Sequence, residues 1–372
     1  MKEIALEFLK IINSRGYVSY IVGGFVRDNI MKIESHDIDV NTNATPKELK
    51  EIFANVKFPK NMNDENSYGS VSIIYKNVLF EVTTFREELE YLDNRHPSSI
   101  HYINDLETDL KRRDFTINAI CMDYKGNILD PLNGKCDLKK KVIKTITNPY
   151  KSFTDDALRI LRAVRFATIL DFSLDKELIE AIKITKKYLK NISYDRKKHE
   201  LDKIFVSIHA KRGIELLKEL DLIEVLELNN IDRIKDYTDL IGIWSMINPK
   251  TYPFTKNEKE LIKNINIVYE LDNLNPLVLY KYGLYVNTIA GINKNLTKKE
   301  INEAYQNLPI QTRTDINITA DEICKLLNKK PSLFLKDIFN HLEINLLTGS
   351  LQNINTSLKE YVLNNFNNIE KN

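Results

Sequence analysis

The sequence predicts an α+β protein, with a mixed sheet and helices at its N-terminal end and an elongated all-helical part after them. Up to about residue 145, short runs rich in β-branched and aromatic residues alternate with turn signals. After about residue 150, apolar residues recur at helical spacing and strand patterns nearly vanish. The length of 372 residues suffices for roughly two to three domains with a sizeable core.

The predicted head contains several strands and two hairpins. A strand is expected over 17–22, where it ends at a Gly-Gly pair, and another over 36–40. Lys76-Asn77 is expected to turn one hairpin, and Lys125-Gly126 a second, whose first strand spans 117–124. These strands predict one small sheet domain.

The remaining chain is predicted to be helices separated by short loops, which prolines interrupt. The interrupting prolines are Pro253, Pro276, Pro309 and Pro331. The predicted segments are a head (1–145), a helical neck (146–210), a helical body (211–275) and a helical tail (276–372).

Composition excludes several classes of protein. The three cysteines are too few, too scattered and odd in number, which argues against a disulfide framework or a four-ligand zinc site. Residues 1–10 carry charges within an amphipathic helical pattern, unlike a signal peptide, and no apolar stretch approaches the ~18 residues of a membrane span. We therefore expect a cytoplasmic protein, a monomer or homodimer, that does not bind membranes.

The net charge alone does not decide whether the protein binds nucleic acid. Lys and Arg number 54 and Asp and Glu 52, so the formal net charge is +2, which alone argues against nucleic-acid binding. The basic residues are nevertheless clustered, and RNA binding depends on local charge rather than on the total. The clusters are 111–113, 139–141 with Lys144, Arg159 with Arg162 and Arg165, Lys183 with Lys186, Lys187 and Lys190, and 196–198.

The motif GGFVRD at 23–28 is a candidate phosphate-binding turn. Gly23 and Gly24 would let the backbone approach a ligand, and the following helix start offers free N–H groups to an anion. Arg27, one turn into the helix, could reach the same anion. Taken alone, a Gly-Gly pair would strongly favour a tight strand–helix turn with a surface arginine.

The motif HDIDV at 36–40 is a candidate metal site. Residues two apart in a strand share a face, so Asp37 and Asp39 would converge, and paired carboxylates repel unless a cation lies between them. Hard oxygen ligands suit Mg²⁺. Glu81, on a neighbouring predicted strand, could be a third ligand or an outward-facing acid. The alternatives are a solvated edge strand and a phosphohydrolase site at His36 and Asp37.

The stretch KRRDFTINAI at 111–120 is a candidate nucleotide clamp. Arg113 can fork onto phosphate or ribose oxygens while Asp114 accepts a hydrogen bond from a hydroxyl group. Alone, the stretch would be a charged loop.

Together these motifs resemble nucleotidyltransferases of the polymerase-β type, and most closely the class II CCA-adding enzymes and the related bacterial poly(A) polymerases. The matching stretches are 23–28, 36–40, 111–120, 154–167 and 194–205, with a weaker match over 308–353. The family often has glycines in its tail where this chain has Asn328-Lys329-Lys330-Pro331.

The resemblance implies a polymerase-β-like head and Mg²⁺-dependent addition of C, C and A to the 3′ end of tRNA from CTP and ATP, without a nucleic-acid template. It implies metal ligation by Asp37 and Asp39 and base reading by Asp156 and Arg159, which are expected on one helix face. The implied catalytic residues are Asp37, Asp39 and Glu81, and the implied nucleotide-binding residues are Gly23, Gly24, Arg27, Arg113, Asp114, Asn118, Asp156, Arg159, Arg162 and Arg165. Arg196 and Glu200 are expected to pair with each other and to brace the base-reading residues.

The alternatives within the family are A-only addition and poly(A) synthesis. The segment 87–110 keeps the loop of full CCA enzymes, including a DNRHP stretch at 93–97, and therefore favours CCA addition. The alternatives from other classes are a non-catalytic tRNA-binding protein and a nucleotide-binding regulator.

Overall fold

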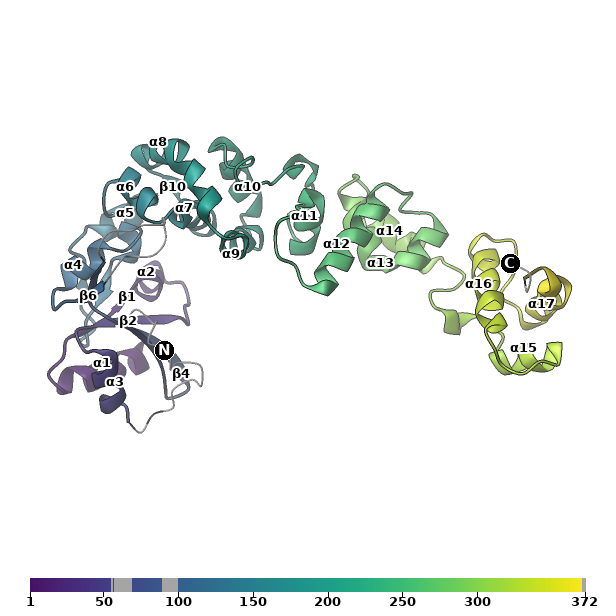
Figure 1. Ribbon diagram of the computed structural model, residues 1–372, viewed down its shortest axis with the longest axis horizontal. Helices are drawn as coiled ribbons and strands as arrows, with labels where there is room; N and C mark the ends of the chain where they lie inside the picture. The colour runs from purple at the N-terminus through teal and green to yellow at the C-terminus, as the bar shows by residue number, and fades with distance from the viewer. Residues whose placement is uncertain (55, 57–68, 89–99, 370–372) are drawn as a thin grey trace. The chain divides into compact units, whose positions relative to one another are not determined.

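The computed structural model describes residues 1–54, 56, 69–88 and 100–369 (Figure 1). The chain divides into two compact units, residues 1–227 and 228–372. The predicted loop stretch 93–97 lies outside the described residues.

The first unit contains a six-stranded mixed sheet in the order β3-β4-β2-β1-β7-β8. Its strands are β1 (Ser19–Val22), β2 (Ile38–Thr42), β3 (Ser70–Tyr75), β4 (Val78–Thr84), β7 (Cys121–Met122) and β8 (Ile128–Leu129). β2 and β4 run parallel, and every other neighbouring pair in this sheet is antiparallel. The prediction of a mixed sheet in the head is confirmed.

Local sequence signals explain the first hairpin, whereas the second differs from its prediction. Lys76 and Asn77 both have positive φ (48° and 63°), as a two-residue turn between twisted strands requires. The strand predicted over 117–124 is wrong in its first half, where Thr116–Asn118 form a 3₁₀ turn (η1). Asn118 points its side chain at two other polar side chains there, and a strand would break this arrangement.

Helices α1 (Lys2–Ser14) and α3 (Pro46–Ile52) belong to the core of the first unit. The Phe8 ring stacks on the rings of Phe53 and Phe80, at centroid distances of 4.7 and 4.0 Å. The amphipathic N-terminal helix predicted from the sequence is therefore confirmed as part of the core.

Shorter elements surround the sheet and lead into the helices. They are α2 (Gly24–Met31), β5 (Arg86–Glu88), β6 (Ile100–Tyr102), α4 (Leu106–Lys111), α5 (Gly134–Lys140), β9 (Val142–Ile143) and α6 (Pro149–Asp155). The elements that follow are α7 (Leu158–Leu170), β10 (Ser173–Leu174), α8 (Lys176–Thr185), η2 (Lys186–Asn191), α9 (Tyr194–Phe205) and α10 (Ala210–Glu219). The predicted change from strands to helices near residue 150 is confirmed.

Helix α10 packs against α7 and α9 through Gly213. A Cβ atom at Gly213 would lie 2.5 Å from Ile204 Cγ2 and 2.8 Å from Thr168 Oγ1. The compact unit therefore continues past the neck boundary predicted at residue 210, up to Glu227. The division into head, neck, body and tail stays a prediction.

The second unit is helical in its described part. Its helices are η3 (Ile231–Arg233), α11 (Leu240–Ile247), α12 (Lys256–Tyr269), α13 (Pro276–Ile292), α14 (Lys298–Gln306), η4 (Arg313–Asp315), α15 (Ala320–Leu327), α16 (Phe334–Leu347) and α17 (Asn355–Ile369). Pro276 opens α13, and Asn328 ends α15 with a φ of 52°. Asn tolerates this left-handed conformation, so it can end the helix without a glycine. Among the described residues, no helix is both long and apolar enough to span a membrane.

We expect Gly213→Ala to lower the free energy of unfolding by about 1–3 kcal/mol, because the added methyl group overpacks the contact with α7 and α9. This cost opposes the higher helix propensity of alanine. Urea unfolding of the full chain, followed by circular dichroism, measures it. Lys211→Ala, at an exposed position of α10, is the control and should stay within about 0.5 kcal/mol of the wild type. Equal stability of the two variants would contradict the close packing.

Candidate active site

The turn between β1 and α2 places the predicted phosphate-binding glycines next to a carboxylate and a guanidinium group. Gly23 has a φ of 75°, which favours glycine. A Cβ atom there would lie 3.4 Å from Asp39 Oδ2 and 3.5 Å from Arg113 Nη1. Gly24 begins α2, so the free N–H groups of the helix start follow directly.

Three carboxylates lie in one electrostatic neighbourhood. Asp39 in β2 pairs in register with Glu81 in the parallel strand β4. Burial raises the pKa of Asp39; Arg113 opposes this shift, and the Asp37 carboxylate adds to it. Burial, together with Asp39 and Asp37, likewise raises the pKa of Glu81. The sequence prediction that one strand carries both aspartates is wrong, because β2 begins at Ile38 and Asp37 precedes it.

The donor set suits a hard divalent cation. Asp37 and Asp39 supply oxygen ligands, and their mutual repulsion would fall if a cation lay between them. In the described part of the chain, no three His, Cys, Asp or Glu side chains form a group that could hold a metal ion. Two carboxylates leave coordination positions for water and substrate phosphates, as Mg²⁺ sites commonly do. The role of Glu81 as a third ligand stays a prediction.

A chain of buried polar contacts links the phosphate-binding turn to α7. Arg27 Nη1 donates to Asn118 Oδ1 at 2.7 Å, and Asn118 Nδ2 donates to Asp114 Oδ1 at 3.1 Å. Asp114 Oδ2 in turn accepts from Arg162 Nε at 2.7 Å. Four predicted site residues thus form one continuous network.

The carboxylate of Asp114 is held ionised. Burial alone would raise its pKa, but the Arg162 charge and hydrogen bonds from Asn118 and Arg162 outweigh burial and lower the pKa to about 2. Asp114 therefore remains a hydrogen-bond acceptor at neutral pH, as the recognition of a hydroxyl group requires.

Arg113 is held by residues that the sequence analysis missed. Its Nη2 donates to Asn41 Oδ1 at 2.9 Å, and Asn41 Nδ2 donates to Asp109, a fully buried acid. Asp109 Oδ1 also accepts from Arg112 Nε at 2.9 Å. Asn41 could have been found from the sequence, because it lies two residues after Asp39 on the same strand face.

The two predicted base-reading residues do not share one helix. Asp156 follows α6 and has extended backbone geometry, and its Oδ1 accepts from the Leu158 N–H at 3.0 Å. Arg159 lies in α7, where its guanidinium donates to Ser152 Oγ at 3.0 Å and to the Arg112 carbonyl at 2.7 Å. The prediction of one shared helix face is therefore wrong, although the Asp156 carbonyl still accepts from the Arg159 N–H.

The predicted pair between Arg196 and Glu200 is also wrong. Arg196 Nη2 lies 3.7 Å from Asp156 Oδ2, and Glu200 Oε2 lies 3.1 Å from Arg165 Nε. Of the three arginines predicted to form a basic face on α7, Arg162 and Arg165 thus form internal ion pairs rather than free charges, whereas Arg159 donates to neutral oxygens.

Lys203 of α9 is a further cation that the sequence analysis did not single out. Burial and the charges of Arg165 and Arg162 lower its pKa, while Glu200 and Asp37 oppose the shift. Lys203 therefore lies within electrostatic range of the carboxylates. The spacing of 196, 200 and 203 along one helix face was the available signal.

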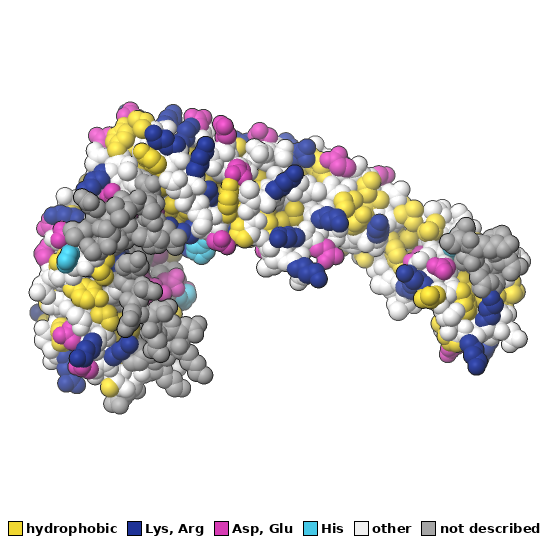
Figure 2. Space-filling model, in the orientation of Figure 1, with side chains coloured by type: hydrophobic (Ala, Val, Ile, Leu, Met, Phe, Trp, Pro, Cys, Tyr) yellow, Lys and Arg dark blue, Asp and Glu magenta, His cyan; other side chains and the backbone are white. Residues whose placement is uncertain are grey.

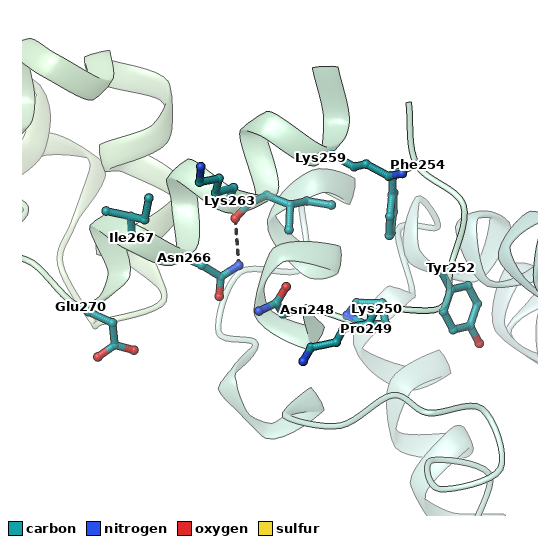
Figure 3. Close-up of a pocket in the computed structure, with 11 residues that line it drawn as sticks. Asn248, Pro249, Lys250, Tyr252, Phe254, Lys259, Lys263, Asn266, Ile267 and Glu270 are labelled. Carbon is teal, nitrogen blue, oxygen red and sulfur yellow. Dashed lines mark hydrogen bonds between the residues drawn. The ribbon is translucent and has the colours of Figure 1, made fainter. Parts of the chain in front are cut away.

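A separate pocket in the second unit, of about 640 Å³, lies between α12 and the segment 248–254 (Figure 3). Apolar and aromatic side chains and three lysines line it, among them Lys250, Lys259, Lys263, Tyr252 and Phe254. On the face shown in Figure 2, lysine and arginine side chains are interspersed with acidic ones in each unit, as the near-zero net charge implies. The carboxylates and arginines of the candidate site belong to the first unit.

Three family profiles match the chain. They are described as "Poly A polymerase head domain" (residues 19–144), "Probable RNA and SrmB-binding site of polymerase A" (171–231) and "tRNA nucleotidyltransferase domain 2" (250–362). The first match includes all strands of the six-stranded sheet, the second includes α8 to α10, and the third lies in the second unit.

Named proteins are similar over nearly the whole chain. The CCA-adding enzyme of Oceanobacillus iheyensis is 31% identical, with 97% of each chain covered. That of Bacillus subtilis is also 31% identical, with 96% of this chain and 97% of the relative covered.

Solved structures share the fold. The Bacillus stearothermophilus CCA-adding enzyme in complex with CTP matches with a TM-score of 0.79 at 24% identity, covering 99% of this chain and 98% of that chain. The Thermotoga maritima CCA-adding enzyme complexed with tRNA matches with a TM-score of 0.70 at 20% identity, covering 97% and 94%.

We expect Asp114→Asn to lower the free energy of unfolding by about 2 kcal/mol at neutral pH, because it removes a buried carboxylate with a depressed pKa. Such a carboxylate stabilises the fold above its unfolded pKa of about 3.9. This contribution is lost as the pH falls through the folded value of about 2. Urea unfolding of both proteins should therefore show a difference that is constant down to about pH 4 and shrinks below it. A difference that grows in acid would contradict this assignment.

Proposed function

Because the chain belongs to the CCA-adding enzyme family of tRNA nucleotidyltransferases, we propose that it adds C, C and A to the 3′ end of tRNA in the cytoplasm. CTP and ATP are the substrates, and pyrophosphate is released. One observation of the site supports this most directly: the Asp39 carboxylate and the Arg113 guanidinium both lie within 3.5 Å of the position that a Cβ atom at Gly23 would take. A triphosphate, a divalent cation and a compensating positive charge are needed together for nucleotidyl transfer.

Enzymes of the polymerase-β nucleotidyltransferase type generally use divalent metal ions, and here Mg²⁺ is the ion that we propose. Asp37 and Asp39 would hold it. When bound, divalent ions of this class supply a lowered pKa at the attacking 3′-hydroxyl and neutralise charge on the leaving pyrophosphate. The raised pKa of Asp39 supports a cation at this place. Burial and the Asp37 charge disfavour the negative charge of Asp39 more than Arg113 stabilises it, and a bound cation would supply the missing positive charge.

The remaining residues bind and orient the nucleotide. The N–H groups at Gly24 and the guanidinium of Arg27 would bind the triphosphate, and Arg113 and Asp114 the ribose and its phosphates. Asn118 would hold Arg27 and Asp114 in a fixed relation, since it hydrogen-bonds both. Arg162 and Arg165 would act through Asp114 and Glu200 rather than by direct phosphate contact.

Asp156 and Arg159 would read the base in place of a template. A guanidinium has five N–H donors, and Arg159 uses two side-chain nitrogens within the protein, in bonds to Ser152 and Arg112. Its remaining donors, with the Asp156 carboxylate as acceptor, can complement the edges of C and A. Arg196 would hold Asp156 in place by its charge.

Incorporation of labelled nucleotides into tRNA that lacks its 3′ CCA tests this proposal against the alternatives. The full activity adds two C residues with CTP alone and all three nucleotides with both substrates. Addition of A only to tRNA that already ends in CC would indicate A-only addition, and long A tails would indicate a poly(A) polymerase. Binding of tRNA without any incorporation would indicate a non-catalytic tRNA-binding protein.

Asp37→Ala and Asp39→Ala should each reduce the addition of both C and A by at least about 10³-fold, because both remove a proposed metal ligand. Neither variant should unfold, since each relieves repulsion between carboxylates. Single-turnover incorporation measures the rates. Glu34→Ala, at an exposed acid in the same segment, is the control and should react like the wild type. Near-wild-type rates for both aspartate variants would overturn the metal assignment.

Asp156→Ala should reduce the selectivity for CTP and ATP more than it reduces the rate of nucleotidyl transfer. Loss of one polar base contact should reduce the preference for CTP and ATP over UTP and GTP by about tenfold, within the ~1–3 kcal/mol typical of such contacts. Competition between labelled nucleotides measures this preference. Glu180→Ala, an exposed acid on α8, should leave it unchanged. If Asp156→Ala selects as sharply as the wild type, Asp156 does not read the base.

A further inference from the structure

One aromatic ring contacts three arginines of the candidate site. The guanidinium carbons of Arg165, Arg27 and Arg162 lie 4.3, 5.3 and 5.6 Å from the centroid of the Phe166 ring. Arg27 comes from α2, next to the phosphate-binding turn, whereas Arg162 and Arg165 share α7 with Phe166. The ring is therefore common to two elements that are far apart in the sequence.

The arrangement compensates for repulsion between the three positive charges. Each arginine has its own carboxylate: Asp28 for Arg27, Asp114 for Arg162 and Glu200 for Arg165. The electron-rich face of an aromatic ring attracts guanidinium groups further, without taking a hydrogen-bond donor from them. Arg27 can thus keep an N–H group for a ligand while the ring fixes its position.

The ring is itself held in place by a second ring. Phe115 meets Phe166 edge to face, with centroids 5.7 Å apart and an interplanar angle of 80°. Phe115 is fully buried and directly follows Asp114. Phe166 itself is only half-buried, so it borders the site rather than filling the core.

We propose that Phe166 is a positioning residue that aligns Arg27 with the pair of Asp114 and Arg162, so that the triphosphate and ribose contacts are preformed before a nucleotide binds. This inference rests on the proposed function. The ring acts through Arg27, which would bind the triphosphate, and through Arg162, which holds the ribose-binding Asp114. Because none of these contacts involves the base, loss of the ring should weaken the binding of CTP and ATP equally. This equality separates Phe166 from the base-reading residues.

The test compares the full-length wild type with three variants. Phe166→Leu removes the ring, and Phe166→pentafluorophenylalanine keeps the size of the ring while reversing the charge distribution on its faces. Phe172→Leu is the matched control, because Phe172 is a buried aromatic residue just after α7 for which no guanidinium contact is found among the described residues. Calorimetry measures the binding of CTP and ATP, and incorporation into tRNA lacking CCA measures KM and kcat.

We expect both Phe166 variants to raise the KM and Kd of CTP and ATP about tenfold, which corresponds to ~1.4 kcal/mol. The kcat and the KM for tRNA should stay within about twofold of the wild type. Phe172→Leu should lower the melting temperature but leave nucleotide binding unchanged.

Two results would overturn the inference. One is wild-type nucleotide affinity of the fluorinated variant, which would leave Phe166 with a packing role only. The other is an equal loss of affinity in Phe172→Leu, which would make the effect a general consequence of instability. If Phe166→Leu does not fold, the fluorinated variant carries the test alone. A wild type that binds nucleotides but incorporates none would refute the proposed function, and the calorimetric comparison would still test Phe166.

Discussion

The buried ion pair between Asp114 and Arg162 connects the sheet to the helices that follow it. Asp114 lies between α4 and η1, and Arg162 lies on α7, with their side chains 2.5 Å apart. Burying either charge alone would cost several kcal/mol. Each must therefore keep the other as a partner, and this requirement fixes α7 against the sheet. The contacts of Asn118 and Arg27 on one side, and of Phe166 on the other, extend from this pair.

The need of a buried charge for a partner also distinguishes the carboxylates near Gly23 from the other acids of the first unit. Asp114, Glu200 and Asp109 are buried and each has an arginine beside it. For Asp39 and Glu81, by contrast, no ion pair is found in the described ranges, and the pKa of each is raised by burial and by neighbouring acids. The buried acids are thus each paired, whereas Asp39 is half-buried and Glu81 is exposed. The charges of Arg113 and Arg162 offset that of Asp39 only in part, so a local excess of negative charge remains. This excess is what a divalent cation would neutralise.

Local signals were sufficient to predict most of the elements, whereas they did not predict which side chains from different elements pair with one another. The Gly-Gly turn, the Lys76-Asn77 hairpin and the amphipathic helices follow from backbone preference and hydrophobic spacing, and the structure contains them. The sequence predicts Asp156 in the same helix as Arg159, but α6 ends just before Asp156 and α7 begins at Leu158. The hydrophobic spacing does not reveal so short a break. Arg196 and Glu200 satisfy the i, i+4 rule, yet each finds a partner in an earlier segment, because α9 packs against α7. Asp109 gave no sequence signal, since its partners Asn41 and Arg86 come from two separate strands.

The formal charge of +2 does not distinguish basic residues that are paired inside the protein from those that are exposed. Arg27, Arg162 and Arg165 all have carboxylate neighbours, so their charges are largely compensated inside the first unit and contribute little to long-range attraction of RNA. Their acidic partners are counted in the same sum and cancel them there too. Attraction of a phosphate backbone must therefore come from exposed lysines outside these pairs, such as those at 187 and 190. Arg27 would instead bind one nucleotide at short range, while Arg162 and Arg165 would hold the acids Asp114 and Glu200 in place, so that the ion pairs fix the geometry of the site in advance. Nearly equal numbers of acids and bases are thus compatible with an RNA-processing enzyme, because the two kinds of basic residue have different tasks.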